Sequence, residues 1–101
     1  LLPMDDALIQ SSLDFSGRPY LAWRVPFTST KIGSFDSELV QEFFNAIAMN
    51  AGITMHVTML AGVNSHHIAE AVFKSVAKSF RNAINVDPRQ SGSIPSTKGS
   101  L

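Results

Sequence analysis

Apolar residues recur along the chain with two different spacings, and these predict strands and helices in turn. Residues 7–15 and 19–27 are rich in apolar, branched and aromatic side chains, and Leu13 and Phe15 alternate with Asp14. An apolar period of two is typical of a half-buried strand. Because only a short glycine-containing gap separates the two stretches, we expect them to form an antiparallel hairpin.

The segment 36–50 changes to a helical period. Its apolar residues recur at intervals of three and four and so share one helix face; they are Leu39, Val40, Phe43, Phe44 and Ile47. Asp36 is the expected N-cap of this helix, because its carboxylate can accept from the first free backbone amides. Gly52 is the expected left-handed residue just past its end.

A third strand and a second helix follow. Alternation of Ile53, Met55 and Val57 with polar residues predicts a strand over 53–60. A second helix is expected from about residue 66 to residue 84, with Asn64 or Ser65 as its cap. Its predicted buried stripe consists of Ile68, Ala69, Val72, Phe73, Val76, Ala77 and Phe80.

The order of elements predicts the fold class. Strand, strand, helix, strand, helix is typical of an α+β layer, with two helices packed on one face of a mixed β-sheet. We expect residues 1–86 to form this unit. Residues 87–101 are rich in proline, glycine and serine and are expected to be an irregular tail.

Composition restricts the chemistry that the chain can carry. Eight basic and eight acidic residues cancel to a net charge of zero, which argues against a nucleic-acid or membrane surface built on bulk charge. The chain has no cysteine, so disulfides and thiolate metal sites are excluded. Any metal must be held by histidine, carboxylates or water, a donor set that suits manganese, zinc or iron.

Targeting signals are not visible in the sequence. Residues 1–6 lack the basic and apolar blocks of a signal peptide, and no apolar run reaches the roughly 18 residues of a membrane span. We therefore expect a cytoplasmic protein. The chain does not begin with Met, which indicates a piece of a longer protein.

The start of the second predicted helix carries the most informative polar pattern. His66, Glu70 and Lys74 are four residues apart and share one face, and His67 neighbours Glu70 at a spacing of three. The side chains of adjacent helix residues point about 100° apart, so His66 and His67 are poorly placed to coordinate one ion together. Either one metal with a free imidazole or two metals would suit this pattern. The alternative is a pair of surface or hydrogen-bonded histidines.

Two further segments are candidates for anion binding. In 95–99, Pro-Ser-Thr-Lys-Gly, the hydroxyls of Ser96 and Thr97 and the ammonium of Lys98 can donate to a phosphate. The alternative is a solvated polar tail. Arg18, in the gap between the first two strands, is a third possible contact, although such arginines often merely decorate a turn.

Five ordered runs resemble the imidazoleglycerol-phosphate dehydratase family across the whole chain. These runs are residues 13–21, 35–44, 51–56, 64–74 and 94–99. The resemblance implies a fold made of two duplicated halves, each resembling the second domain of ribosomal protein S5. The present chain resembles the C-terminal half.

The resemblance also implies a site. In the family each half contributes a His-His-x-x-Glu helix, and the two halves together hold two Mn²⁺ ions per site. This implies that His66, His67 and Glu70 are metal-binding and catalytic residues. Some members place a further ligand on the first helix at the position of Glu42; the alternative there is a solvated helix residue. The substrate-phosphate contacts implied by the family are Arg18, Lys74, Ser96 and Lys98.

The implied activity is that of a hydro-lyase of histidine biosynthesis, which dehydrates imidazole glycerol phosphate to imidazole acetol phosphate. This chain would supply half of the site and would be inactive alone. The implied partners are the other half and identical subunits, in a homo-oligomer of 24 copies, with neither nucleic acid nor membrane. The alternatives are a non-catalytic metal- or phosphate-binding half-domain and, from the fold alone, a nucleic-acid binder, which the neutral charge opposes.

Overall fold

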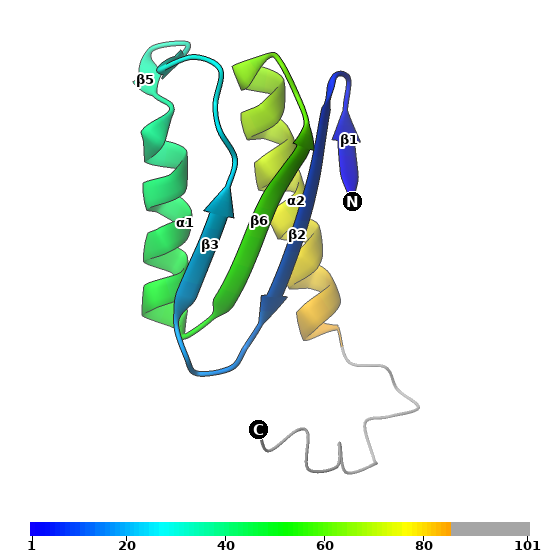
Figure 1. Cartoon of the computed structure of the whole chain (residues 1–101). Coiled ribbons are helices and arrows are strands. Elements are labelled where there is room, and N and C mark those ends of the chain that lie inside the picture. Colours follow the sequence, from blue (N-terminus) through cyan, green and yellow to red (C-terminus); the bar gives the residue numbers. More distant parts are fainter. Residues whose placement is uncertain (86–101) are drawn as a thin grey trace.

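The computed structural model describes residues 1–85, which form one sheet covered by two helices on the same face (Figure 1). The four-stranded sheet has the order β1-β2-β6-β3, and a small β4–β5 ribbon precedes the first helix. This confirms the predicted α+β class with two helices on a mixed sheet. The elements are β1 Leu2–Met4, β2 Ala7–Asp14, β3 Tyr20–Arg24, β4 Lys31–Ile32, β5 Phe35–Asp36, α1 Glu38–Ala51, β6 Thr54–Ala61 and α2 Ser65–Ile84.

The predicted hairpin between the first two long strands is wrong. β6 lies between β2 and β3, antiparallel to the first and parallel to the second, so that Thr54 pairs with both Asp14 and Tyr20. Strands that flank a third strand are about 10 Å apart, a gap that the loop between β2 and β3 spans. The amide of Gly17 in that loop donates to the carbonyl of Gly52, at 2.9 Å. The loop is therefore tied to the start of β6.

The core lies between the sheet and the helices. Ile53, Met55 and Val57 alternate along the segment that forms β6, and all three are fully buried. Their neighbours in the core come from β2 and from one face of each helix, chiefly Ile9, Val40, Phe44, Ile68, Val72 and Val76. Burial of large apolar side chains at this strand period is the main force that holds the helices on this face.

The helix ends agree with the sequence in two places and differ in a third. Gly52 ends α1 with φ +66° and ψ +42°, and Asn64 caps α2 by accepting from the amide of His67. Asp36 is not the N-cap of α1: it lies in β5 and is paired with Lys31 at 2.7 Å, and Ser37 takes the cap position. Neither helix within residues 1–85 is long and apolar enough to cross a membrane.

The outer face of the helices exposes apolar side chains that the sequence pattern placed in the core. Leu39, Phe43 and Phe73 are each 41–50% exposed, and Ala77 is exposed as well. The rings of Phe43 and Phe73 lie 5.4 Å apart and join α1 to α2. The apolar stripe of each helix is thus wider than one sheet can cover.

Candidate functional site

A row of three polar side chains runs along the exposed side of α2. Nε2 of His66 lies 3.6 Å from Oε1 of Glu70, and Nζ of Lys74 donates to Oε2 of the same carboxylate at 2.8 Å. The helix places them together because residues four apart lie on one face. The bond from Lys74 is the main reason that the pKa of Glu70 is lowered. The carboxylate therefore stays ionised to a lower pH than an ordinary glutamate.

His67 points to a different set of neighbours. Its Nδ1 lies 2.6 Å from Oδ1 of Asp6, and its Nε2 lies 3.5 Å from Oδ2 of Asp5. Both carboxylates belong to the turn between β1 and β2, and Asp5 adopts φ +51° there. The hydrogen bond with Asp6 raises the pKa of His67. In turn, hydrogen bonds from the amide of Asn64, the ring of His67 and the amide of Val63 hold the pKa of Asp6 well below its usual range.

The two histidine rings diverge, as the helical geometry predicts. Their centroids are 6.3 Å apart and their planes differ by 67°. Within residues 1–85, no group of three or more histidine and carboxylate side chains is arranged to hold a metal ion. His66 with Glu70 and His67 with Asp5 therefore form two partial donor sets on the two sides of the start of α2.

Glu42 lies apart from these donor sets. It is exposed on α1 and lines a shallow hollow of about 390 Å³ with Glu38, Gln41 and Asn45. The structure does not bring its carboxylate together with the histidines of α2 into a metal-binding group. Its role as a ligand stays a prediction.

Arg18 lies at the opposite end of the sheet from His66 and His67. Its carbonyl accepts from the hydroxyl of Thr54 at the start of β6, at 2.8 Å, whereas α2 follows the end of the same strand. Eight strand residues at about 3.3 Å each separate the two ends, a distance of roughly 25 Å. Arg18 and His67 of one chain therefore cannot contact one small ligand. Ser96 and Lys98, the other predicted phosphate contacts, lie outside the described residues.

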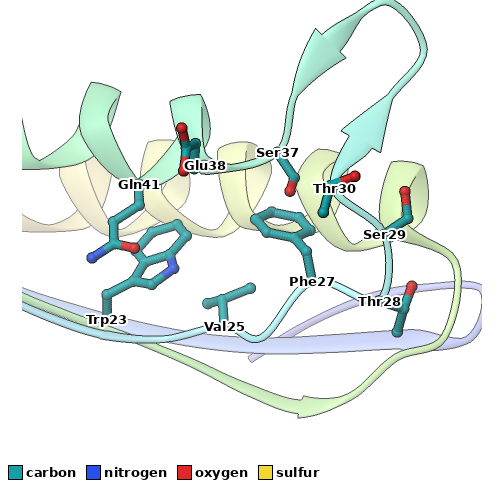
Figure 2. A pocket seen from close by; sticks show the side chains of 9 residues that line it. All are labelled: Trp23, Val25, Phe27, Thr28, Ser29, Thr30, Ser37, Glu38 and Gln41. Carbon is teal, nitrogen blue, oxygen red and sulfur yellow. The ribbon is translucent and has the colours of Figure 1, made fainter.

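Two hollows flank the loop that links β3 to α1. The first, of about 280 Å³, lies beneath the start of α1, where Gln41 extends toward Trp23 and Phe27 lies near Ser37 (Figure 2). It contains no histidine. The second, of about 460 Å³, lies between this loop and the start of α2 and includes His66 and Lys31 in its lining. His66 thus opens onto a space large enough for a small ligand.

Asp5 and Asp6 were not among the residues expected at the site. The only signal in the sequence was a pair of consecutive carboxylates just before a strand. Asp6 is 61 residues away from His67 along the chain. Only the pairing of β2 with β6 carries this turn to the start of α2. A turn with consecutive acidic residues before a strand is a weak pattern on its own.

The family model and the relatives found by sequence carry the same name. The family model for imidazoleglycerol-phosphate dehydratase matches residues 1–80. The imidazoleglycerol-phosphate dehydratase of Dinoroseobacter shibae is 64% identical over 101 residues, which are 100% of this chain and 52% of that protein. The protein of the same name from Methylorubrum extorquens is 60% identical over 100 residues, 99% of this chain and 51% of that protein. The chain thus spans about half the length of these relatives.

Solved structures agree with the sequence relatives. The imidazoleglycerol-phosphate dehydratase of Staphylococcus aureus matches with a TM-score of 0.83 at 41% identity, over 85% of this chain and 50% of that chain. The enzyme from Pyrococcus furiosus, solved in complex with (S)-C348, matches with a TM-score of 0.81 at 39% identity, over 99% of this chain and 54% of that chain. The described fold is therefore shared with half of each of these chains.

Proposed function

Because the chain belongs to the imidazoleglycerol-phosphate dehydratase family, we propose that it supplies half of a site that dehydrates imidazole glycerol phosphate to imidazole acetol phosphate in histidine biosynthesis. The observation that carries the proposal is the start of α2. There His66, which lies 3.6 Å from Glu70, lines a hollow, and His67 is held by Asp6. Such a cluster of ionisable groups at a helix start, in a chain of this family, is typical of a site rather than of a solvated surface.

The proposed cofactor is Mn²⁺, with two ions per complete site. Imidazole nitrogens and carboxylate oxygens are donors that suit manganese, and the lowered pKa of Glu70 keeps its carboxylate charged. His66, His67 and Glu70 would hold the ions, with Glu42 as a further candidate. When bound, the metal supplies Lewis acidity, which favours the deprotonated form of a coordinated imidazole ring.

Phosphate binding is the second proposed role of the chain. Lys74 lies one turn beyond Glu70 on the same face of α2, 56% exposed, with donors left over after its bond to that carboxylate. It can therefore hold a phosphate while the metal-binding residues hold the other end of the substrate, which orients the substrate for elimination. Arg18, Ser96 and Lys98 complete the proposed phosphate contacts.

Completion of the site requires more polypeptide than this chain. The donor sets of α2 are too small for an ion that takes about six ligands, Arg18 is at the far end of the sheet, and an apolar helix face is exposed. These features support a site shared with the other half and with identical subunits, in a homo-oligomer of 24 copies. If the ions bridge chains, a chelator should lower the particle mass measured by light scattering on the complete enzyme. A particle of unchanged mass would contradict bridging by metal.

A chimera tests the activity directly. In the Dinoroseobacter shibae relative, the matched residues would be replaced by this chain, at 64% identity. We expect the chimera to convert imidazole glycerol phosphate in the presence of Mn²⁺ and this chain alone to be inactive. A folded, metal-loaded chimera without dehydratase activity would contradict the proposal and favour a half-domain that binds without turnover.

A further inference from the structure

Asp6 connects two parts of the chain that are distant in sequence. Its Oδ2 accepts hydrogen bonds from the backbone amides of Val63, at 2.6 Å, and Asn64, at 2.8 Å. Its Oδ1 lies 2.6 Å from Nδ1 of His67. Both oxygens are thus engaged with the loop that leads into α2 and with the first turn of that helix.

This arrangement selects one form of the His67 ring. A carboxylate has no proton to donate when ionised, so the short contact requires a proton on Nδ1. In the neutral ring the lone pair then lies on Nε2, which is the atom that can ligate a metal. Nε2 is on the side of Asp5, 3.5 Å from its carboxylate. His67 is therefore presented with a defined tautomer and a defined direction.

His66 lacks a comparable restraint. Its side chain is 73% exposed against 30% for His67, and its one close polar neighbour among residues 1–85 is Glu70, at 3.6 Å. The two adjacent histidines thus differ in how firmly their rings are held. His67 is held by a residue outside the helix, whereas the ring of His66 is free to turn. The difference arises because the two rings point in different directions on the helix, and only His67 faces the turn that carries Asp6.

We propose that Asp6 is the positioning residue of the site: it holds the proton on Nδ1 of His67 and so presents Nε2 of this ring to the metal. The inference rests on the proposed metal-binding role of His67. Asp6 would not itself be a ligand, because both of its carboxylate oxygens are already engaged. Its two bonds to the backbone of the α2 loop fix the carboxylate, which gives the ring a rigid support.

Asp6→Asn is the informative substitution because it is nearly isosteric. The amides of Val63 and Asn64 still need an acceptor, so the amide oxygen of the new side chain should stay on them and turn its NH₂ group toward His67. That group donates, so it requires a lone pair on Nδ1 and moves the ring proton to Nε2. We expect Mn²⁺ affinity to fall about 10- to 100-fold. Asp14→Asn, at the other end of β2, is the control and should leave affinity unchanged.

The measurements separate positioning from mere stabilisation of the loop. ¹⁵N NMR of the imidazole rings in the metal-free chain should report a proton on Nδ1 of His67 in the wild type and on Nε2 in Asp6→Asn. Mn²⁺ titration of the complete enzyme, with each substitution in the half that this chain supplies, followed by electron paramagnetic resonance, gives the affinity. Asp6→Glu, which retains the carboxylate, should keep the wild-type tautomer and recover affinity. If Asp6→Asn keeps the wild-type tautomer or affinity, the inference is wrong.

One further variant distinguishes this failure from that of the proposed function. His67→Ala removes the ligand itself and should lower Mn²⁺ affinity at least as much as Asp6→Asn. If His67→Ala binds Mn²⁺ as the wild type does, the metal-binding role of His67 is wrong, and the inference falls with it. If His67→Ala weakens binding and Asp6→Asn does not, only the positioning role is overturned.

Discussion

Lys74 donates a hydrogen bond to Glu70 one turn away on α2, with Nζ 2.8 Å from Oε2, so a predicted phosphate contact and a predicted metal ligand share one ion pair. Binding of a metal to Glu70 would compete with Lys74 for the carboxylate. The ammonium group would then have more donors free for an anion. Metal and phosphate should therefore bind more tightly together than apart.

This relationship predicts the effect of Lys74→Met in the complete enzyme. The variant should bind phosphate-bearing ligands about tenfold more weakly or worse, because one charge-assisted hydrogen bond is lost. Its affinity for imidazole should change little. Isothermal titration of both ligands in Mn²⁺-loaded protein measures the two effects.

Lys78→Met is the matched control, because Lys78 is exposed one further turn along the same helix. It removes the same charge and should leave both affinities unchanged. Equal losses in the two variants would mean that Lys74 acts only through net charge. Loss of imidazole and phosphate binding to the same extent in Lys74→Met would contradict a phosphate contact.

His66→Ala should lower the manganese content of the complete enzyme. The variant removes the imidazole donor that lines the hollow at the start of α2 and lies 3.6 Å from Glu70. His56→Ala is the control: this exposed histidine lies on β6, with Nδ1 3.4 Å from Arg24. Elemental analysis after gel filtration compares the two. Equal manganese content in His66→Ala and His56→Ala would rule out His66 as a ligand.

The pair of Asp6 and His67 predicts a pH dependence of the metal-free protein. The hydrogen bond raises the pKa of His67 above its ordinary value of 6.5, so the protonated ring contributes stability in full below pH 6.5. That contribution is lost as the pH rises through the raised pKa. With chelator present, the urea midpoint should therefore fall as the pH is raised above about 6.5. Metal affinity should rise over the same range, because the cation competes with a proton.

His67→Gln identifies the source of this dependence. The variant removes the titrating ring, so its urea midpoint should depend less on pH between about 6 and 8 than that of the wild type. In acid, stability is lost through Asp6 instead. The pKa of Asp6 is lowered, so the contribution of this carboxylate to stability is present above the ordinary aspartate pKa of 3.8 and is lost as the pH falls below that value. An unchanged profile in His67→Gln above pH 6 would show that another group is responsible.

Gly52→Ala should destabilise the fold by about 1–2 kcal/mol, because an L-residue with a side chain is strained at φ +66°. An added Cβ would also lie 3.4 Å from Cα of Gly17 in the loop after β2. Gly33→Ala is the control, since it has φ +62° with open space around its Cβ. Denaturant unfolding of both variants separates backbone strain from contact with the Gly17 loop. A neutral Gly52→Ala would contradict both.

The two helices and the three long strands could be predicted from the sequence, because helix and strand periods are local properties. The short strands β1, β4 and β5 were not predicted, because two or three residues are too few to show a period. The spacing of Ile68, Val72 and Val76 predicts a helix with one buried face, and Asn64 and Gly52 mark helix ends by their own side-chain and backbone chemistry. The same spacing places His66 and Glu70 together on the exposed side. These conclusions depend on neighbours at most four residues away.

Contacts between distant segments were decided by the tertiary structure alone. The sequence favoured a hairpin, since its gap is short, but β6 inserts between β2 and β3 because its apolar face completes the core. That insertion carries Asp6 to His67, 61 residues away, and leaves Arg18 at the far end of the sheet. No local pattern encodes such pairings: they depend on which strands together bury the most apolar surface against the two helices.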